Sequence, residues 1–426
     1  MLSKVNSSSY LRVVLIGGFV FVVFMNVLKI ALPPQIVNGV FFAVVLGSMA
    51  IFLIPGGRFL KLNRTQLVAA SNLGLILLFS TYSLIYARVD AQACITFALQ
   101  YSVFWISLFV VSGVMLKYLS EEDVLRVLRV ACSISSAVVF LSLIERAVPT
   151  AWMETIINRL YLSKGVGTEA AGLPISYYMM EFGGRVLRVG SIFFEPVTFG
   201  LFAALMTVAA FELARVQGLA PKWKKIRLLF VGCTLLAWVK SGVIIVLLDL
   251  LGRDRRVRLL ALVGLLLTIV LLPMGFLSSS IDWSDAVYHF AGLVQGLQNA
   301  GENPFLGHGL GTAGFQAFNL LSDKGTVGQY FDVANPYRNG NESMIGVIAY
   351  QFGYPYLVLF VILNVSLALS LRHRSRAASV LVLSVFLISF FTESVMSTIF
   401  QFTYAFVLSL LASAQMCATR QKPRAI

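Results

Sequence analysis

Long apolar runs alternate with short polar connectors along almost the whole chain. Most runs are close to the ~20 residues that an α-helix needs to cross the hydrocarbon core of a membrane. A helix satisfies its own backbone hydrogen bonds where water is absent, so we expect the runs to be helical. They cover residues 11–30, 35–54, 66–86, 93–115, 127–144, 191–213, 228–251, 258–278, 343–370, 377–392 and 396–416. The pattern predicts an all-α, polytopic membrane helix bundle.

The connectors fall into two sets that differ in charge. One set is short and carries most of the 33 lysine and arginine residues of the chain. Cytoplasmic loops of membrane proteins are enriched in these residues, so this set and both termini are assigned to the cytoplasm. The other set contains two long loops, residues 145–190 and 279–342, which are assigned to the outer face.

The run 228–251 conflicts with a simple alternation of sides. Basic connectors flank it at both ends, so a single crossing would place one of them outside. Its midpoint is Lys240-Ser241-Gly242, and a lysine at membrane depth marks a functional site or a buried kink. Two half-helices of about twelve residues, ~18 Å each, resolve the conflict with Lys240 at their tip. The chain is thus expected to form about twelve segments in one integral membrane domain, residues 1–426.

Composition excludes several classes of protein. Of the 426 residues, 58% are hydrophobic and 12% are charged, whereas soluble domains carry about 25% charged residues. A soluble enzyme, a secreted disulfide scaffold and a receptor with a single anchor are therefore excluded. The net charge of +14 is explained by cytoplasmic anchoring, and no nucleic-acid partner is expected. The four cysteines have no metal-ligand spacing, so no metal site is expected.

The first long loop ends in charged residues where the chain returns to the membrane. Arg185 and Arg188 precede the segment Ser191-Ile-Phe-Phe-Glu195-Pro196. Arginine binds pyrophosphate oxygens with two parallel hydrogen bonds, although arginines beside a span also serve as interfacial anchors. Glu195 is a carboxylate at membrane depth, which needs a partner. Helical spacing of apolar residues over 152–161 predicts an amphipathic helix, either on the outer surface or packed against the bundle.

The second long loop combines a helix with a glycine-rich run. An apolar stripe over 283–297 predicts a helix that starts near Asp282 and packs in the core. The run Asn303-Pro-Phe-Leu-Gly-His308-Gly-Leu-Gly-Thr-Ala-Gly-Phe lacks Gly-Lys-Ser/Thr, so it is no phosphate-binding P-loop, but its glycines permit close approach of a ligand. His308 is a candidate base or hydrogen-bond donor, or a loop histidine without chemistry. Arg338 and Glu342 precede the next span.

Three segments, in this order, resemble the O-antigen polymerase/ligase superfamily. They are the Arg-x-x-Arg…Phe-Glu-Pro segment, the run NPFLGHGLGTAGF, and the polar stretch NGNES with the Gly353-containing helix that follows it. The resemblance spans residues 185–355, and the Phe-Glu-Pro form is similar to that of surface-polysaccharide and exopolysaccharide polymerases. Members of this superfamily are multi-pass proteins of the bacterial inner membrane that move glycans off undecaprenyl pyrophosphate on the periplasmic face.

The resemblance implies a GT-C-like bundle and an inverting glycosyltransferase that polymerises lipid-linked repeat units without a metal or a cofactor. Family members have essential arginines in both main periplasmic loops. Arg185, Arg188 and Arg338 match those places. We expect these three arginines, with Lys240 and Glu342, to bind the substrate. We expect Glu195 or His308 to act in catalysis, by orienting or deprotonating the acceptor hydroxyl. The implied partners are the undecaprenyl-pyrophosphate-linked glycan, membrane lipid, a chain-length regulator and a flippase.

The chain also departs from the family pattern. The split helix of the family usually has Ser-Arg-Gly at its tip, where this chain has Lys240-Ser241-Gly242. The ligase pattern of Arg before Trp is replaced by Ile281-Asp282, and the ligase His-Asn pair by Asn341-Glu342. These differences favour a polymerase over a ligase. A ligase of the same superfamily stays open as an alternative. So does a transporter or flippase for the same lipid-linked oligosaccharide, because broken helices and intramembrane charges occur in transporters too.

Overall fold

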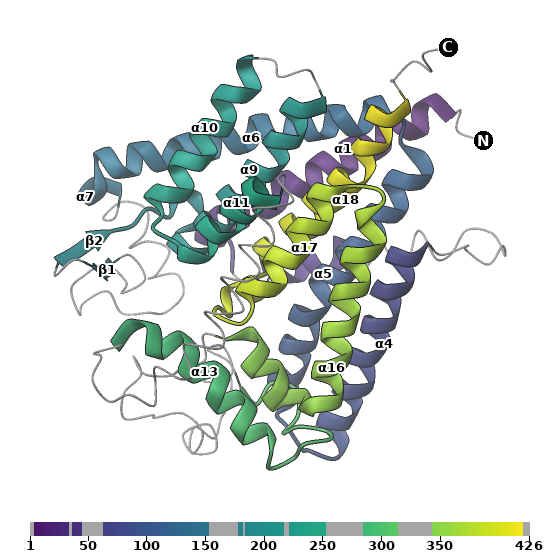
Figure 1. Ribbon diagram of the computed structural model, residues 1–426, viewed down its shortest axis with the longest axis vertical. Helices are drawn as coiled ribbons and strands as arrows, with labels where there is room; N and C mark the ends of the chain where they lie inside the picture. The colour runs from purple at the N-terminus through teal and green to yellow at the C-terminus, as the bar shows by residue number, and fades with distance from the viewer. Residues whose placement is uncertain are drawn as a thin grey trace.

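The computed structural model describes residues 4–33, 36–44, 63–152, 178–181, 184–216, 221–252, 284–313 and 343–420 (Figure 1). The longer helices are α1 (Lys4–Val23), α4 (Arg64–Ile85), α5 (Ala91–Tyr118), α6 (Glu121–Ala147), α9 (Pro196–Val216), α10 (Pro221–Leu236), α11 (Lys240–Gly252), α13 (Ser284–Ala300), α16 (Met344–Arg372), α17 (Arg376–Ile388) and α18 (Thr398–Arg420). Shorter elements are α2 (Met25–Ala31), α7 (Pro149–Trp152) and the 3-10 turns η3 (Ser191–Phe193) and η4 (Ser394–Met396). The predicted helical architecture is confirmed, apart from one short antiparallel pair, β1 (Tyr178–Glu181) and β2 (Gly184–Leu187), which was not expected.

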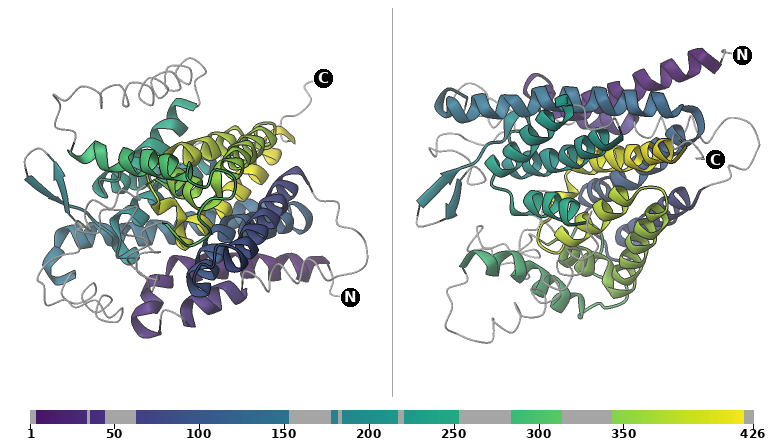
Figure 2. Two further views of the ribbon diagram at one scale, coloured as in Figure 1. Left: turned by 90° about the horizontal axis from the view of Figure 1, so that it is seen from below. Right: turned by 45° about the horizontal axis from the view of Figure 1, so that its top comes forward.

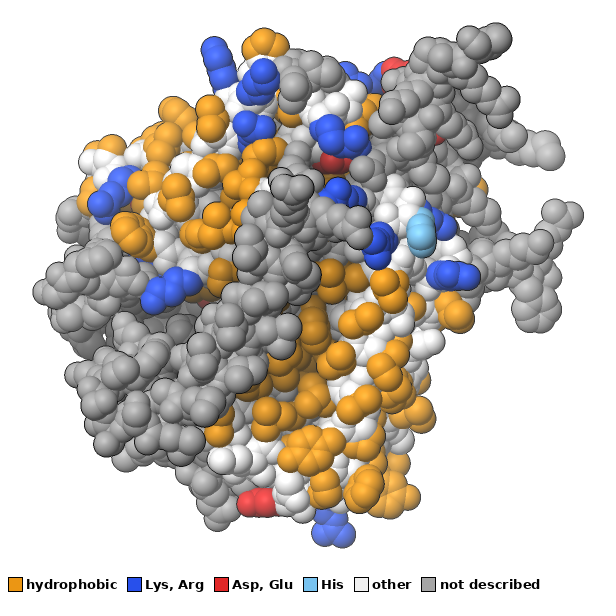
Figure 3. Space-filling model, in the orientation of Figure 1, with side chains coloured by type: hydrophobic (Ala, Val, Ile, Leu, Met, Phe, Trp, Pro, Cys, Tyr) orange, Lys and Arg blue, Asp and Glu red, His pale blue; other side chains and the backbone are white. Residues whose placement is uncertain are grey.

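The described helices support a membrane-embedded bundle. Five of them are long and apolar enough to cross a membrane, namely α4, α6, α9, α16 and the part of α5 from Ala91 to Gly113. Shorter apolar helices lie at Ser8–Val23, Arg376–Ile388 and Thr398–Ser413. Large apolar side chains are exposed on the outside of α4 and α16, among them Leu77, Leu78 and Ile362, and orange side chains cover this region in Figure 3. A surface of this kind suits contact with hydrocarbon rather than water.

Helix α9 lies at the centre of the bundle. Nearly all of its residues are buried, as expected for a helix that is apolar on every side. It packs against α6, α10, α11 and α18, which lie around it in Figures 1 and 2. The ring of Phe202 lies 6.5 Å from the ring of Phe19 in α1 and 4.7 Å from that of Phe193 in η3. The start of α9 is therefore held by neighbours on several sides.

Short polar residues set where the apolar runs become helical. The first N–H groups of a helix have no partner within it, and a side-chain oxygen placed just before the helix can accept one of them. This bond is present at α4, α5, α6, α16 and α17, where the accepting residues are Asn63, Asp90, Ser120, Ser343 and Ser375.

The predicted break in the run 228–251 is present. Helix α10 has 16 residues and ends at Leu236, and α11 has 13 residues and begins at Lys240. At 1.5 Å per residue these helices are ~24 and ~20 Å long, shorter than the ~30 Å thickness of a hydrocarbon core. Both pack against α9.

The two ends of the bundle carry different connections. The start of α1, the end of α18 and the turn between α16 and α17 lie toward one end, whereas α7, the β1–β2 pair and α13 lie toward the other (Figures 1 and 2). The turn between α16 and α17 is basic, with Arg372, Arg374 and Arg376. The separation of this basic turn from the long-loop elements agrees with the division of connectors by charge.

Several expectations fall outside the described residues. They are the amphipathic helix after Trp152, the apolar run 258–278, and the residues Arg338 and Glu342 in the second long loop. The helix expected from Asp282 is described from Ser284 as α13, and it packs against α16 as predicted for a core helix.

The break at Lys240 makes a testable prediction about topology. In a chain whose four cysteines are replaced by alanine, Lys222→Cys and Arg255→Cys should react with a membrane-impermeant maleimide from the same side of the membrane, because two half-helices return the chain to the side it left. Phe305→Cys, at a position 74% exposed at the opposite end, should react only from the other side. Labelling of positions 222 and 255 from opposite sides would show that α10 and α11 together make one crossing.

Candidate functional site

The chain makes a tight buried turn just before α9. Ser191 and Phe194 have positive φ angles of 49° and 54°, a region that residues with a Cβ seldom occupy. Such residues cost about 1–3 kcal/mol each and persist where the surroundings impose them. A contact from α2 helps to hold the turn in this conformation: the Asn26 side-chain amide donates a hydrogen bond to the carbonyl oxygen of Phe193 at 2.7 Å.

The carboxylate of Glu145 is the main support of this turn. Its oxygens accept the N–H of Gly190 at 3.0 and 3.1 Å and the N–H of Ser191 at 2.6 Å. Glu145 is 2% exposed and lies in the last turn of α6. The Ser191 hydroxyl donates to the carbonyl of Val138 in the same helix at 2.7 Å. Glu145 was not singled out from the sequence, where its one signal is a carboxylate directly after the apolar run 127–144.

Arg188 joins this turn to the break between α10 and α11. Its Nε donates to the carbonyl oxygen of Ala237 at 3.2 Å and its Nη2 to that of Trp238 at 3.4 Å. The last carbonyls of a helix have no partner within it, and Trp238 has a positive φ of 50°. The guanidinium therefore satisfies the broken end of α10. Two sequence motifs that were identified separately, Arg188 and the Lys240 tip, meet here.

Two glycines allow the start of α9 to approach the break closely. A Cβ on Gly200 would lie 2.6 Å from Cγ2 of Val239, and a Cβ on Gly242 would lie 2.9 Å from the carbonyl oxygen of Gly200. Helices α9 and α11 are thus in backbone contact near their first turns. Glu195 and Lys240 consequently lie at neighbouring ends of two packed helices.

Glu195 lies immediately before α9. Its Oε2 accepts the Thr198 hydroxyl at 2.7 Å, and the side chain is half-buried. Pro196 occupies the first helical position, where the missing N–H leaves no bond unmade. A carboxylate at the start of a helix is stabilised by the helix dipole. Lys240, the first residue of α11, is exposed.

The remaining residues of the predicted substrate-binding set are described in part. Arg185 lies in β2, where its backbone pairs with Met180 of β1, and the position of its side chain is outside the described part. Arg338 and Glu342 are also outside it. The structure thus brings together Arg188, Glu195 and the Lys240 break.

The glycine-rich run of the second long loop packs against a kink in α16. Gly353 interrupts α16 with a φ of 77°. The N–H groups of His308 and Gly309 donate to the carbonyl oxygens of Tyr350 and Gln351 at 2.9 and 3.1 Å, which the kink frees from helical bonding. The glycines therefore bring the loop backbone against a helix backbone, a close approach that the sequence had suggested for a ligand.

His308 is engaged by its surroundings. Its Nε2 lies 3.1 Å from the carbonyl oxygen of Asn299, so this nitrogen carries the hydrogen of that bond. The imidazole stacks on the Tyr350 ring with centroids 4.2 Å apart. These contacts position the loop on α13 and α16. The catalytic role assigned to His308 from the sequence stays a prediction.

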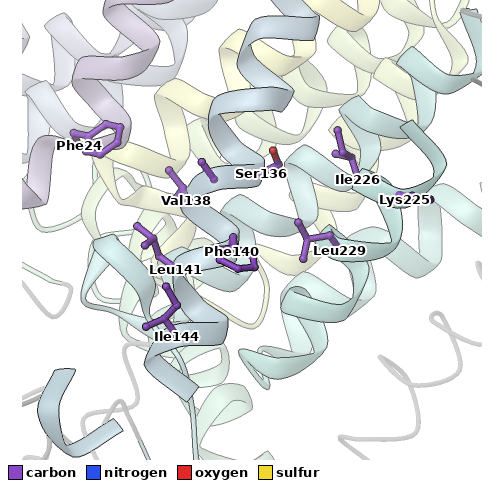
Figure 4. Close-up of a pocket in the computed structure, with 10 residues that line it drawn as sticks. Phe24, Ser136, Val138, Phe140, Leu141, Ile144, Lys225, Ile226 and Leu229 are labelled. Atoms are coloured by element: carbon purple, nitrogen blue, oxygen red, sulfur yellow. The ribbon is translucent and has the colours of Figure 1, made fainter. Parts of the chain in front are cut away.

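An apolar groove lies along the outside of α6 and α10 (Figure 4). Its lining is Phe24, Ser136, Ala137, Val138, Phe140, Leu141, Ile144, Lys225, Ile226 and Leu229. Ile144 directly precedes Glu145, so one end of the groove lies beside the residue that supports the turn before α9. The lining suits a hydrocarbon chain.

Among the described residues, no three His, Cys, Asp or Glu side chains are grouped so that they could hold a metal ion.

Comparison with known protein families and with curated proteins finds no match to the chain. The fixed guanidinium of Arg188 can bind an anion, and the carboxylate of Glu195 at the start of α9 can orient a hydroxyl group.

The contact between Gly200 and the break predicts opposite effects of two similar substitutions. Gly200→Ala should lower the thermal midpoint of the detergent-solubilised protein, because the new methyl group overlaps Val239 and overpacking costs about 1–3 kcal/mol. Gly232→Ala in α10 is the matched control, since a Cβ there meets nothing within 4 Å. It should leave the midpoint unchanged or raise it. Equal midpoints for both variants would show that α9 does not pack on the break as described.

Proposed function

We propose that this protein is a polymerase of undecaprenyl-pyrophosphate-linked oligosaccharide repeat units on the periplasmic face of a bacterial inner membrane. In this proposal the chain is a GT-C-like bundle of about twelve segments with both termini in the cytoplasm. The start of α1 and the end of α18 lie at one end of the bundle (Figure 1), which supports that topology.

The observation that carries the proposal is the fixation of Arg188 at a break between membrane-depth helices. Two carbonyl oxygens hold its guanidinium, and the Glu145-supported turn holds its backbone neighbours. In glycosyl transfer, negative charge develops on the departing pyrophosphate. A cation that is already oriented stabilises this charge without reorganising during the reaction.

The reaction proceeds by displacement at the anomeric carbon of the donor. The acceptor hydroxyl oxygen forms the new bond to that carbon, while the bond from the carbon to the pyrophosphate oxygen breaks with inversion. Undecaprenyl pyrophosphate leaves with the electron pair, and the hydroxyl proton passes to a carboxylate base. Glu195 suits this role better than His308, because the His308 ring is held by Asn299 and Tyr350.

The other predicted residues complete the binding of the anionic donor. The pyrophosphate is bound by the positive charges of Arg185, Lys240 and Arg338 together with that of Arg188. Glu342 accepts hydrogen bonds from sugar hydroxyls. The groove along α6 and α10 ends beside Glu145 and provides an apolar surface for the lipid chain of the donor. No metal ion is needed in this mechanism, since the cations of the chain supply the charge.

A transporter of lipid-linked oligosaccharide is the alternative that one observation favours. The helices are interrupted between α10 and α11 and again between α17 and α18, and transporters commonly bind substrate at broken helices. Against a transporter, Arg188 directly follows strand β2, and Figure 1 shows β2 at the end of the bundle that carries α7.

The role of Arg188 can be tested in cells. Arg188→Ala should reduce polymer at least ~100-fold, the usual effect of losing one donor to a developing oxyanion. Arg188→Lys should restore a small part of the activity, because lysine keeps the charge and loses the planar fork. Polymer is measured by gel electrophoresis and protein abundance by immunoblot of membranes.

The matched control is Arg126→Ala, which removes an arginine that is 50% exposed at the opposite end of α6. This variant should make polymer at the wild-type level. If the Arg188→Ala variant makes as much polymer as the wild type, Arg188 is only an interfacial anchor and the proposed mechanism is contradicted.

A further inference from the structure

The connection between α17 and α18 is polar although both helices are apolar. Residues 389–397 read Ser-Phe-Phe-Thr-Glu-Ser-Val-Met-Ser. Helix α17 has 13 residues, ~20 Å, and so is shorter than the ~30 Å hydrocarbon core. The connection thus lies within the depth of the bundle. A carboxylate at this depth, Glu393, is a functional-site candidate in its own right.

Hydrogen bonds to backbone groups hold this connection in place. The Thr392 hydroxyl accepts the N–H of Ser394 at 3.1 Å, and the N–H of Met396 donates to the Glu393 carbonyl at 2.8 Å. Glu393 precedes η4, yet its side chain makes no capping hydrogen bond there. The N–H of Ile345 donates to the Ser389 carbonyl at 3.1 Å, which ties the connection to the start of α16.

The connection lies beside the elements of the candidate site. The turn η4 contacts α9, α16 and α18, and α17 packs along α11. The start of α11 and the end of α17 lie toward the same side of the bundle in Figures 1 and 2. Glu393 is half-buried, and its charge interacts electrostatically with the hydroxyl of Tyr101 in α5. That hydroxyl is buried and has no hydrogen-bond partner within the described part of the chain.

The chemistry of this group of residues suits a neutral, hydroxyl-rich ligand. A carboxylate accepts hydrogen bonds from hydroxyls, and a tyrosine hydroxyl both donates and accepts. Phe390 and Phe391 are partly buried beside Glu393 and offer apolar ring surface. The negative charge of Glu393 repels a pyrophosphate, which the Arg188 side of the site attracts.

We propose that the α17–α18 connection binds the terminal sugar of the acceptor, with Glu393 accepting hydrogen bonds from its hydroxyl groups. The proposal rests on the proposed polymerase function. It makes Glu393 an acceptor-binding residue and leaves proton transfer to another group.

The test uses purified protein that lengthens lipid-linked repeat units isolated from cells lacking this protein. The probe is the free repeat-unit oligosaccharide, released from its lipid by mild acid, which carries the sugars without the pyrophosphate. It should inhibit the wild type by occupying the acceptor site. Glu393→Gln should raise the inhibition constant about tenfold, since a charge-assisted hydrogen bond is replaced by a neutral one. The kcat should stay within about twofold, far from the loss expected for a general base.

Two controls separate binding from structure. Glu122→Gln removes a carboxylate that is 76% exposed at the opposite end of the bundle, and Arg188→Lys alters the pyrophosphate side; both should keep the wild-type inhibition constant. If Glu393→Gln does not fold, Glu393→Asp decides, because the shorter carboxylate should also weaken inhibition.

The possible failures are distinguishable. An unchanged inhibition constant in a Glu393 variant that lengthens the glycan overturns this inference alone. A large loss of kcat with an unchanged inhibition constant also overturns it, because Glu393 would then act on the proton. If the wild type itself lengthens nothing, the proposed function and this inference both fall.

Discussion

The candidate site depends on one buried interaction, the acceptance of backbone N–H groups from Gly190 and Ser191 by the carboxylate of Glu145. Unsatisfied N–H groups cost several kcal/mol in a membrane, and Ser191 and Phe194 add the strain of positive φ angles. Without the carboxylate at the end of α6, the N–H groups of Gly190 and Ser191 would lose the acceptor that the structure gives them. The positions of Arg188 before the turn and Glu195 after it both follow from it.

Broken helices are the second constraint. Helices α10, α11 and α17 are each shorter than a hydrocarbon core is thick, so polar backbone and side chains lie within an apolar bundle. The end of α10 is satisfied by the Arg188 guanidinium, and the α16 kink by the glycine-rich run. The end of α10 and the kink in α16 are thus each paired with a segment distant in sequence. These pairings bring charged groups together around the start of α9.

The sequence predicts those features that depend on local pattern. Apolar periodicity and the position of the Lys240 break are local, and the described helices agree with them. The partners of charged residues are not local. Glu145 contacts residues about 45 positions away and Arg188 about 50, and nothing in either motif indicates the other. The glycine run shows the same limit, because its glycines predict a close approach but do not indicate the α16 kink against which the run packs.

The most direct test of polymerase function is lengthening of lipid-linked repeat units by purified protein in detergent micelles with EDTA and without ATP. In the proposed mechanism, cleavage of the sugar–pyrophosphate bond supplies the free energy, and arginine and lysine side chains supply the positive charge that a metal would otherwise provide. A polymerase should give a ladder of products under these conditions. A transporter has no work to do without a sealed membrane, so the absence of any ladder would contradict the account. Lengthening that appears only after Mg²⁺ or Mn²⁺ is added would contradict its metal-free mechanism.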